Sequence, residues 1–208
     1  CALATCYIIT HPHLSLMTYN IQTRGDQFQG QLPSEFQILL RDYPRDAWPN
    51  HPNFARSIQN WMGAHNGFRA LSSYVTEDTQ AFLNRDIDDR TFVRRLTKYG
   101  DSLLRNLHGH HTWEDRKFFP ELSAAEERLE AGLDMLEADH EALDSTLDTF
   151  KRHANRAVQL AHLSPDDMTD EAAEVLKSGE ALSVLLARHL ADEEDLVVPI
   201  ILHHQLRG

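Results

Sequence analysis

The 208-residue sequence predicts an all-α fold: an antiparallel up-down four-helix bundle with an irregular N-terminal extension. Apolar residues recur at alternating spacings of three and four in four long stretches, a pattern typical of amphipathic helices. Glycine and proline are few, nine and eight residues, which disfavours a strand-and-turn architecture. The pattern H-x-x-x-E-x5-P occurs twice, from His110 to Pro120 and from His189 to Pro199. The chain therefore consists of two similar halves.

The composition excludes several classes of partner. A formal net charge of -12 repels a phosphate backbone, so we expect no nucleic acid to bind. No stretch approaches the roughly 18 apolar residues needed to span a bilayer, so we expect no membrane contact. Cys1 and Cys6 are the only cysteines. The sequence therefore supports neither a disulfide framework nor a thiolate metal site, which suits a reducing cytoplasm.

We divide the chain into an N-terminal extension, residues 1–47, and a helical domain, residues 48–208. Residues 1–16 have no basic region or cleavage site typical of a secretory signal. Met17 is a candidate start of the native protein, and we expect residues 1–16 to be poorly ordered. Further on, four prolines between residues 33 and 52 favour an irregular lead-in, with a short helix over residues 34–41. We expect Trp48 to pack on the domain.

The first two bundle helices are expected to begin at Phe54 and after the acidic break at residues 86–89, which offers an N-cap. The inner face of the first carries Ile58, Trp61, His65, Phe68, Ser72, Val75, Thr79 and Phe82. The inner face of the second carries Phe92, Leu96, Tyr99, Leu103, Leu107, His110, Glu114 and Phe118. We expect Pro120 to end or kink the second helix, because proline cannot donate the next hydrogen bond.

The third and fourth helices complete the bundle. The segment Ser123 to Glu126 has the form of a capping box and predicts the start of the third. Its inner face carries Leu129, Leu133, Leu136, His140, Leu143, Leu147 and Phe150. A break around Pro165 precedes the fourth, whose inner face carries Leu182, Leu186, His189, Glu193, Leu196 and Ile200. Four long amphipathic helices with short connections predict a bundle.

Each inner face carries a histidine, and two also carry a glutamate one turn later, which places imidazole and carboxylate on the same side of the helix. An unpartnered buried carboxylate costs several kcal/mol, and a polar His–Glu network would satisfy only part of that cost. Two divalent cations would satisfy all of these groups together, and nitrogen and oxygen ligands suit iron, manganese or zinc. The repeat also predicts matching roles for Glu114 and Glu193. We therefore expect a two-metal site, with a metal-free polar network as the alternative.

The order His, H-x-x-x-E, His, H-x-x-x-E resembles the hemerythrin-like, or HHE cation-binding, domain family, over about residues 48–204. The stretch Leu107 to Leu122, LHGHHTWEDRKFFPEL, is particularly similar to the second-helix motif of that family. The resemblance implies a non-haem di-iron centre, two Fe ions, inside the bundle. It also implies histidine terminal ligands and two bridging carboxylates. These are His65, His110, His140 and His189, with Glu114 and Glu193 as the bridges.

The resemblance leaves the fifth histidine open. Oxygen-carrying hemerythrins have a second histidine one turn after the third-helix ligand, and here that position is Asp144. We expect Asp144 to be solvated or to support a ligand, with direct ligation as the alternative. His111 is a candidate fifth ligand. A helix turns about 100° per residue, so His110 and His111 are not expected to face the centre equally well. We expect Asp192 and Glu194 to face outward, and the remaining histidines in the helices to lie on the surface: His108, His153, His162, His203 and His204.

The resemblance further implies that the protein binds or senses O₂ or a related small diatomic or peroxide ligand. The alternatives are a di-iron enzyme acting on peroxide or nitric oxide and an iron-responsive interaction module. A hydrogen-bond donor beside the site would influence that choice, and Trp61, Ser72 and Tyr74 are the candidates. No pattern in the sequence indicates an oligomeric state.

Overall fold

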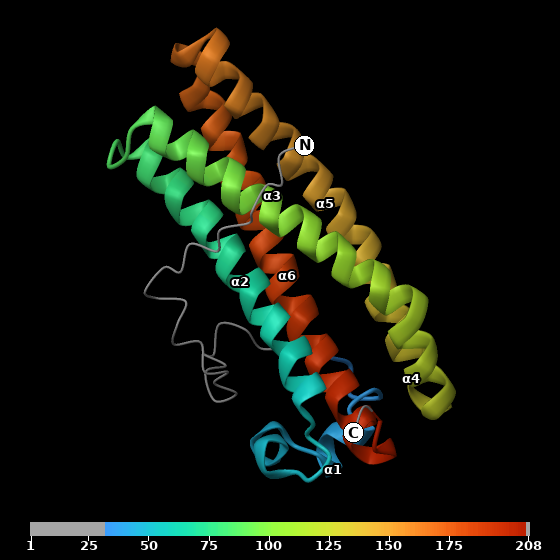
Figure 1. Ribbon diagram of the computed structural model, residues 1–208. Helices are drawn as coiled ribbons and strands as arrows, with labels where there is room; N and C mark the ends of the chain where they lie inside the picture. Colours follow the sequence, from blue (N-terminus) through green and yellow to red (C-terminus); the bar gives the residue numbers. More distant parts are fainter. Residues whose placement is uncertain (1–31, 207–208) are drawn as a thin grey trace, which may run out of the picture.

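The computed structural model describes residues 32–206, and over that range the chain is helical without a strand. It is a helical bundle built mainly from four long helices (Figure 1): α2 Arg56–Leu83, α3 Asp89–Trp113, α5 Glu130–Leu163 and α6 Met168–His204. Helix α2 packs against α3 and α6, and α5 packs against the same two. Within the described residues no helix is both long and apolar enough to cross a membrane. The expectations for residues 1–16, Met17 and both cysteines lie outside the described residues.

The sequence identified the inner faces of the long helices well. Every residue predicted for the inner faces of α2, α5 and α6 is buried. In α3 the exceptions are Tyr99 and His110, which are partly exposed. The predicted N-cap of α3 is also confirmed, since the Asp88 carboxylate accepts a hydrogen bond of 2.7 Å from the backbone N–H of Thr91. Spacings of three and four are thus sufficient to find these faces.

The end of α3 departs from a regular helix. A π-helical turn, η4 Glu114–Phe118, follows directly, and within it the N–H of Phe119 donates to the carbonyl of Glu114, five residues earlier. A further helix, α4 Phe119–Ala125, then begins with Pro120 in its first turn. Proline is well tolerated there because the first N–H groups of a helix have no intrahelical partner. Pro120 therefore starts a short helix after the π-turn.

The predicted capping box is wrong. Ser123 lies inside α4, and a 3₁₀ turn, η5 Glu127–Leu129, separates that helix from α5, which begins only at Glu130. The reason is that helical structure continues beyond Pro120: the backbone N–H of Glu126, which Ser123 would have to cap, already donates to the carbonyl of Leu122 at 2.9 Å. The next helix start has no side-chain cap.

The segment before α2 covers the C-terminal end of α6 (Figure 1). It contains α1 Ile38–Asp42 and the 3₁₀ turn η3 Arg45–Asn50. Trp48 is fully buried in one apolar cluster with side chains of α2 and α6, which confirms the prediction that it packs on the bundle, and its indole N–H donates to the carbonyl of Tyr43 at 2.7 Å. Because this segment covers the outer side of α6, residues 189–202 are buried all around the helix.

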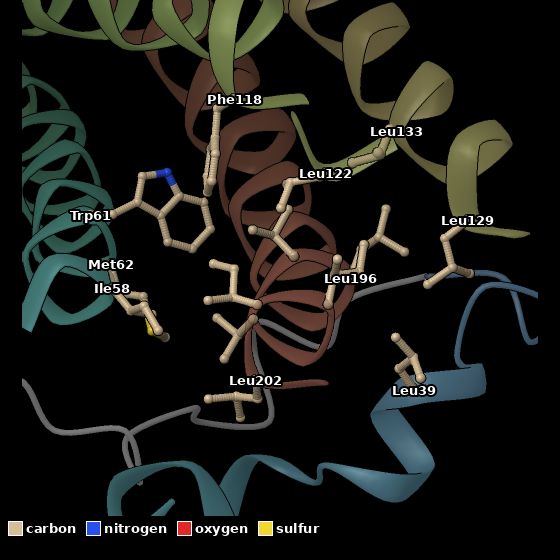
Figure 2. Close-up of a cluster of buried hydrophobic side chains, with 14 of the residues drawn as sticks. Leu39, Ile58, Trp61, Met62, Phe118, Leu122, Leu129, Leu133, Leu196 and Leu202 are labelled. Carbon is tan, nitrogen blue, oxygen red and sulfur yellow. The ribbon is translucent and has the colours of Figure 1, made fainter. Parts of the chain in front are cut away.

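Two apolar clusters fill the bundle. Figure 2 shows part of the first, where side chains from α1, α2, α4 and α5 converge around the end of α6; it includes Leu39, Ile58, Met62, Leu122, Leu133 and Leu196. The second fills the opposite end and includes Phe68, Leu107, Leu143 and Leu186. In α2 the first cluster ends at Met62 and the second begins at Phe68, with His65 between them. The other three long helices also carry histidines near the boundary between the two apolar clusters.

Candidate metal centre

One set of side chains joins α2, α3, η4 and α6. His65, His110, Glu114 and Glu193 each offer one ligand atom, and these atoms all lie within 4.8 Å of one another. The Nε2 atoms of His65 and His110 are 3.0 Å apart. Oε1 of Glu114 lies 2.9 Å from Nε2 of His110, and Oε2 of Glu193 lies 3.4 Å from Nε2 of His65. Two imidazoles and two carboxylates therefore converge on one point.

A second set joins α3, α5 and α6. His111, His140 and His189 also offer ligand atoms within 4.8 Å of one another. The Nε2 atoms of His140 and His189 are 3.1 Å apart, and the rings of His111 and His140 stack at 3.9 Å. Glu114 Oε2 approaches His140 Nε2 at 3.8 Å, and Glu193 Oε2 approaches His189 Nε2 at the same distance. Each glutamate thus reaches both sets, as a bridge between two ions requires.

His110 and His111 both face the interior, but they point to different positions, in line with the expectation that they would not face one centre equally well. His110 joins the set with His65, whereas His111 joins the set with His140 and His189. Helix α3 lies between α2 on one side and α5 on the other. The rotation of about 100° between adjacent residues therefore directs the two rings to two different positions. The π-turn that follows is a feature often found at functional sites.

The histidines of α2 and α5 are each oriented by a carboxylate. Nδ1 of His65 hydrogen-bonds Oε1 of Glu194 at 3.1 Å, and Nδ1 of His140 hydrogen-bonds Oδ1 of Asp115 at 2.6 Å. Each carboxylate belongs to the residue directly after one of the two central glutamates, so the arrangement repeats with the two halves of the chain. Hydrogen bonds of this kind fix the tautomer and leave Nε2 available as a metal ligand.

Glu194 does not face outward, contrary to the sequence-based expectation. Its side chain is 4% exposed and hydrogen-bonds Arg69 at 2.9 Å and Arg45 at 2.8 Å. Burial alone would raise the pKa of Glu194, but the His65 hydrogen bond and the charges of Arg69 and Arg45 outweigh it and lower the pKa. Asp192 is also buried, 3.6 Å from Arg188. The prediction failed because it considered the four helices alone, whereas the preceding segment covers this side of α6.

Of the three proposed hydrogen-bond donors, one reaches the site. The indole N–H of Trp61 donates to Oε1 of Glu114 at 2.7 Å. Ser72 instead hydrogen-bonds Ser183, and the ring of Tyr74 lies at a tilt against that of Tyr99, with centroids 5.2 Å apart. Since neither oxygen of Glu193 accepts a hydrogen bond, the two glutamates differ, and the predicted equivalence of the halves does not extend to their surroundings.

The other polar residues considered from the sequence lie outside both sets. Asp144, His108, His162 and His203 are exposed, and His153 and His204 are partly buried. His153 pairs with Glu171, and His204 pairs with Glu126. These surroundings agree with the surface positions expected for the five histidines and with a solvated Asp144.

Burial controls the charge of the central histidines. It lowers the pKa of His65 and of His140 to about 4, and it lowers the pKa of His111 and His189 as well. Neutral imidazoles present the lone pair that a metal ion binds. Burial and the nearby charge of Glu114 raise the pKa of Glu193 well above its usual range. Neutral imidazoles and buried carboxylates therefore favour binding of a cation at the centre.

Comparison with known proteins bears on this geometry. The sequence model of the hemerythrin HHE cation-binding domain matches residues 56–201, which include all seven side chains of the two sets. The chain belongs to the hemerythrin family. This match confirms the resemblance noted in the sequence and supports metal-cation binding by the bundle. No curated protein and no solved structure gives a significant match to this hemerythrin-family chain.

Proposed function

We propose that this hemerythrin-family protein holds two iron ions and binds O₂ or a related small ligand. The observation that carries the proposal is the convergence of seven side chains into two sets that share both glutamates. One ion would be held by two histidines and the other by three. The proposed ligands are His65 and His110 for the first ion, His111, His140 and His189 for the second, and Glu114 and Glu193 as bridges.

Buried atoms without partners favour metal over a polar network. Both ring nitrogens of His111 and both carboxylate oxygens of Glu193 are buried without a hydrogen-bond partner. A His–Glu network would leave these groups unsatisfied, at roughly 1–3 kcal/mol for each. The two close pairs of Nε2 atoms, 3.0 and 3.1 Å apart, also favour metal binding, because two acceptor nitrogens can share a cation. The donor set, imidazole and carboxylate without thiolate, fits iron, and manganese or zinc would fit it too.

Ferrous ions would supply electrons and an open coordination position for a small ligand. The protein's own residues orient the ligands and exclude water. Phe68 lies edge-on to His110 with ring centroids 5.0 Å apart, and Phe119 stacks on His140 at 5.5 Å. Trp61 fixes Glu114 by its hydrogen bond and contacts the ring of His65 at 4.3 Å. These aromatic walls, together with the two apolar clusters, keep the position between the sets dry.

We also infer the finer architecture from these contacts. The connections from α2 to α3 and from α5 to α6 are short, and the longer one from α3 to α5 consists of η4, α4 and η5. Each long helix packs against its neighbours in the chain. This favours helices that alternate in direction. It also favours a single domain for the bundle, with the end of the segment we assigned to the extension, from Leu39 to Arg45, packed against α6.

Metal analysis of protein purified without chelators tests the proposal. We expect two iron ions per chain, and far fewer in His110→Ala and Glu193→Ala, with His108→Ala as a matched exposed control. Full occupancy in both variants would reject the site. An absorption band that forms in air and disappears under vacuum would support reversible O₂ binding. Turnover of peroxide or nitric oxide would indicate the enzyme instead, and iron binding with neither response would favour the interaction module.

A further inference from the structure

The two carboxylates that orient His65 and His140 have different surroundings. The Asp115 side chain is 40% exposed and comes from the turn η4. The Glu194 side chain is 4% exposed and bonds two arginines in addition to His65. One of these, Arg69, belongs to the bundle, whereas Arg45 comes from the segment that precedes it. The half of the centre with His65 is therefore tied to a part of the chain outside the four long helices.

Arg45 is held on several sides. Its Nη1 donates to Glu194 Oε2 at 2.8 Å, its Nε donates to Asp195 Oδ1 at 2.6 Å, and its Nη2 donates to the carbonyl of Ala191 at 3.2 Å. The guanidinium also lies over the ring of Trp48, 4.8 Å from its centroid. A guanidinium held in this way is a fixed charge with fixed direction, unlike a surface ion pair whose partners move freely.

We propose that Arg45 is a positioning residue for the metal ion held by His65, an inference that rests on the proposed function. Arg45 and Arg69 bond different oxygens of Glu194, which fixes the plane of the carboxylate. The carboxylate in turn fixes the His65 ring through Nδ1, so that Nε2 points to the ion. Loss of Arg45 frees one oxygen of Glu194 and lets the carboxylate turn away from this orientation.

The effect should be confined to one ion. Among the side chains of the two sets, Glu194 hydrogen-bonds His65, and His65 belongs to the set with His110. The set with three histidines is oriented by Asp115, which contacts His140 from another helix. A general loss of stability would weaken both ions, so a selective loss distinguishes positioning from a structural role.

Coupling between two sites is reciprocal. If docking of Arg45 strengthens metal binding at His65, metal binding strengthens docking of the turn η3 by the same factor. The segment before the bundle would then respond to occupation of the centre. This gives the protein a means of reporting its metal state at the surface.

Titration of the metal-free full chain with Co²⁺ tests this inference, because the absorption of Co²⁺ depends on its ligand geometry. In Arg45→Gln we expect one of two Co²⁺ ions to bind about tenfold more weakly, the usual order for an outer contact to a ligand, with a changed absorption band for that ion only. Arg45→Lys keeps the charge but lacks the planar guanidinium, so it should recover only part of the affinity. The matched control is Arg95→Gln, which breaks a similar ion pair with Asp78 away from the centre.

The outcomes separate the two proposals. If the wild-type protein binds fewer than two Co²⁺ ions, the proposed function fails whatever Arg45 does. If it binds two and Arg45→Gln matches it in affinity and spectrum, only the present inference fails, and equal weakening of both ions overturns it as well. Should Arg45→Gln not fold, Arg69→Gln removes the bond to the other oxygen of Glu194 from within α2. The same selective loss is expected there, and its absence would reject positioning through Glu194.

Discussion

Replacing Glu193 with methionine should stabilise the metal-free protein and greatly reduce its stabilisation by metal. The carboxylate is fully buried, neither oxygen accepts a hydrogen bond, and burial raises its pKa. A buried polar group without a partner costs roughly 1–3 kcal/mol, and methionine of similar length removes that cost. A gain of about 2 kcal/mol corresponds to a rise of roughly 4–8 °C in melting temperature for a chain of this size.

When metal is present, the wild type should instead melt at a higher temperature than Glu193→Met. A ligand that binds only the folded state stabilises it by about 2.7 kcal/mol at a free concentration of 100 Kd. The wild-type protein should gain this stability on addition of Fe²⁺ under argon, whereas Glu193→Met should gain far less because one bridge is lost. Thermal unfolding followed by circular dichroism, with and without metal, measures all four values.

Glu180→Met is the matched control, since Glu180 is an exposed glutamate on the same helix. Its melting temperature should follow the wild type in both conditions, because surface substitutions usually change stability by less than about 0.5 kcal/mol. The reasoning is refuted if metal-free Glu193→Met melts at or below the wild-type temperature. It is also refuted if that variant keeps the full stabilisation by metal.

Three further predictions concern other parts of the molecule. His111→Ala should lose one of two bound irons by metal analysis while His108→Ala keeps both, and equal contents would remove His111 from the site. Trp48→Ala should lower the free energy of unfolding by about 3–5 kcal/mol in urea titrations, because it empties a fully buried position; a loss below 1 kcal/mol would contradict that packing. Hydrogen bonds from Arg128 lower the pKa of Glu126 to about 2, so the stability they supply is present above about pH 4.5 and is lost as pH falls towards 2. The melting-temperature difference between wild type and Glu126→Gln should therefore shrink from pH 5 to pH 3, and a constant difference would be evidence against this pair.

The long helices and six of the seven central side chains follow from spacing alone. An amphipathic helix buries one face, so apolar residues such as Phe68 and Leu143 recur at spacings of three and four residues. His65 and His140 lie on the same faces and are buried with them. Glutamate one turn after histidine then places both groups on that face. These inferences hold because they depend only on regular helical geometry.

What the sequence could not predict depends on departures from that geometry. The expectation for His111 treated the centre as a single point, whereas His110 and His111 belong to two different sets of side chains. The expected capping box at Ser123 assumed that Pro120 ends a helix, and the π-turn before it lets Pro120 begin one. A π-helical hydrogen bond, from an N–H to the carbonyl five residues earlier, has no recognisable sequence pattern of its own.

Burial of Glu194 could have been suspected from one signal. The run from Asp192 to Asp195 is entirely acidic, yet apolar residues surround it from Leu190 to Leu202. Such charge density in an apolar helix requires cations nearby, and an arginine in the preceding segment was available. No periodicity identifies that arginine as Arg45, since pairing between distant segments depends on how the chain returns across the bundle.

The position of this segment affects where the domain should be cut for study. The family match begins at residue 56, so similarity alone places the boundary just after the part of the chain that contains Leu39, Arg45 and Trp48. A fragment that starts there would expose the apolar end of α6 to water and remove the hydrogen bonds of Arg45 to Glu194 and Asp195. Such a fragment would tend to aggregate, and its metal affinity would underestimate that of the whole chain. Here burial defines the working unit, and it is longer than the region of recognisable similarity.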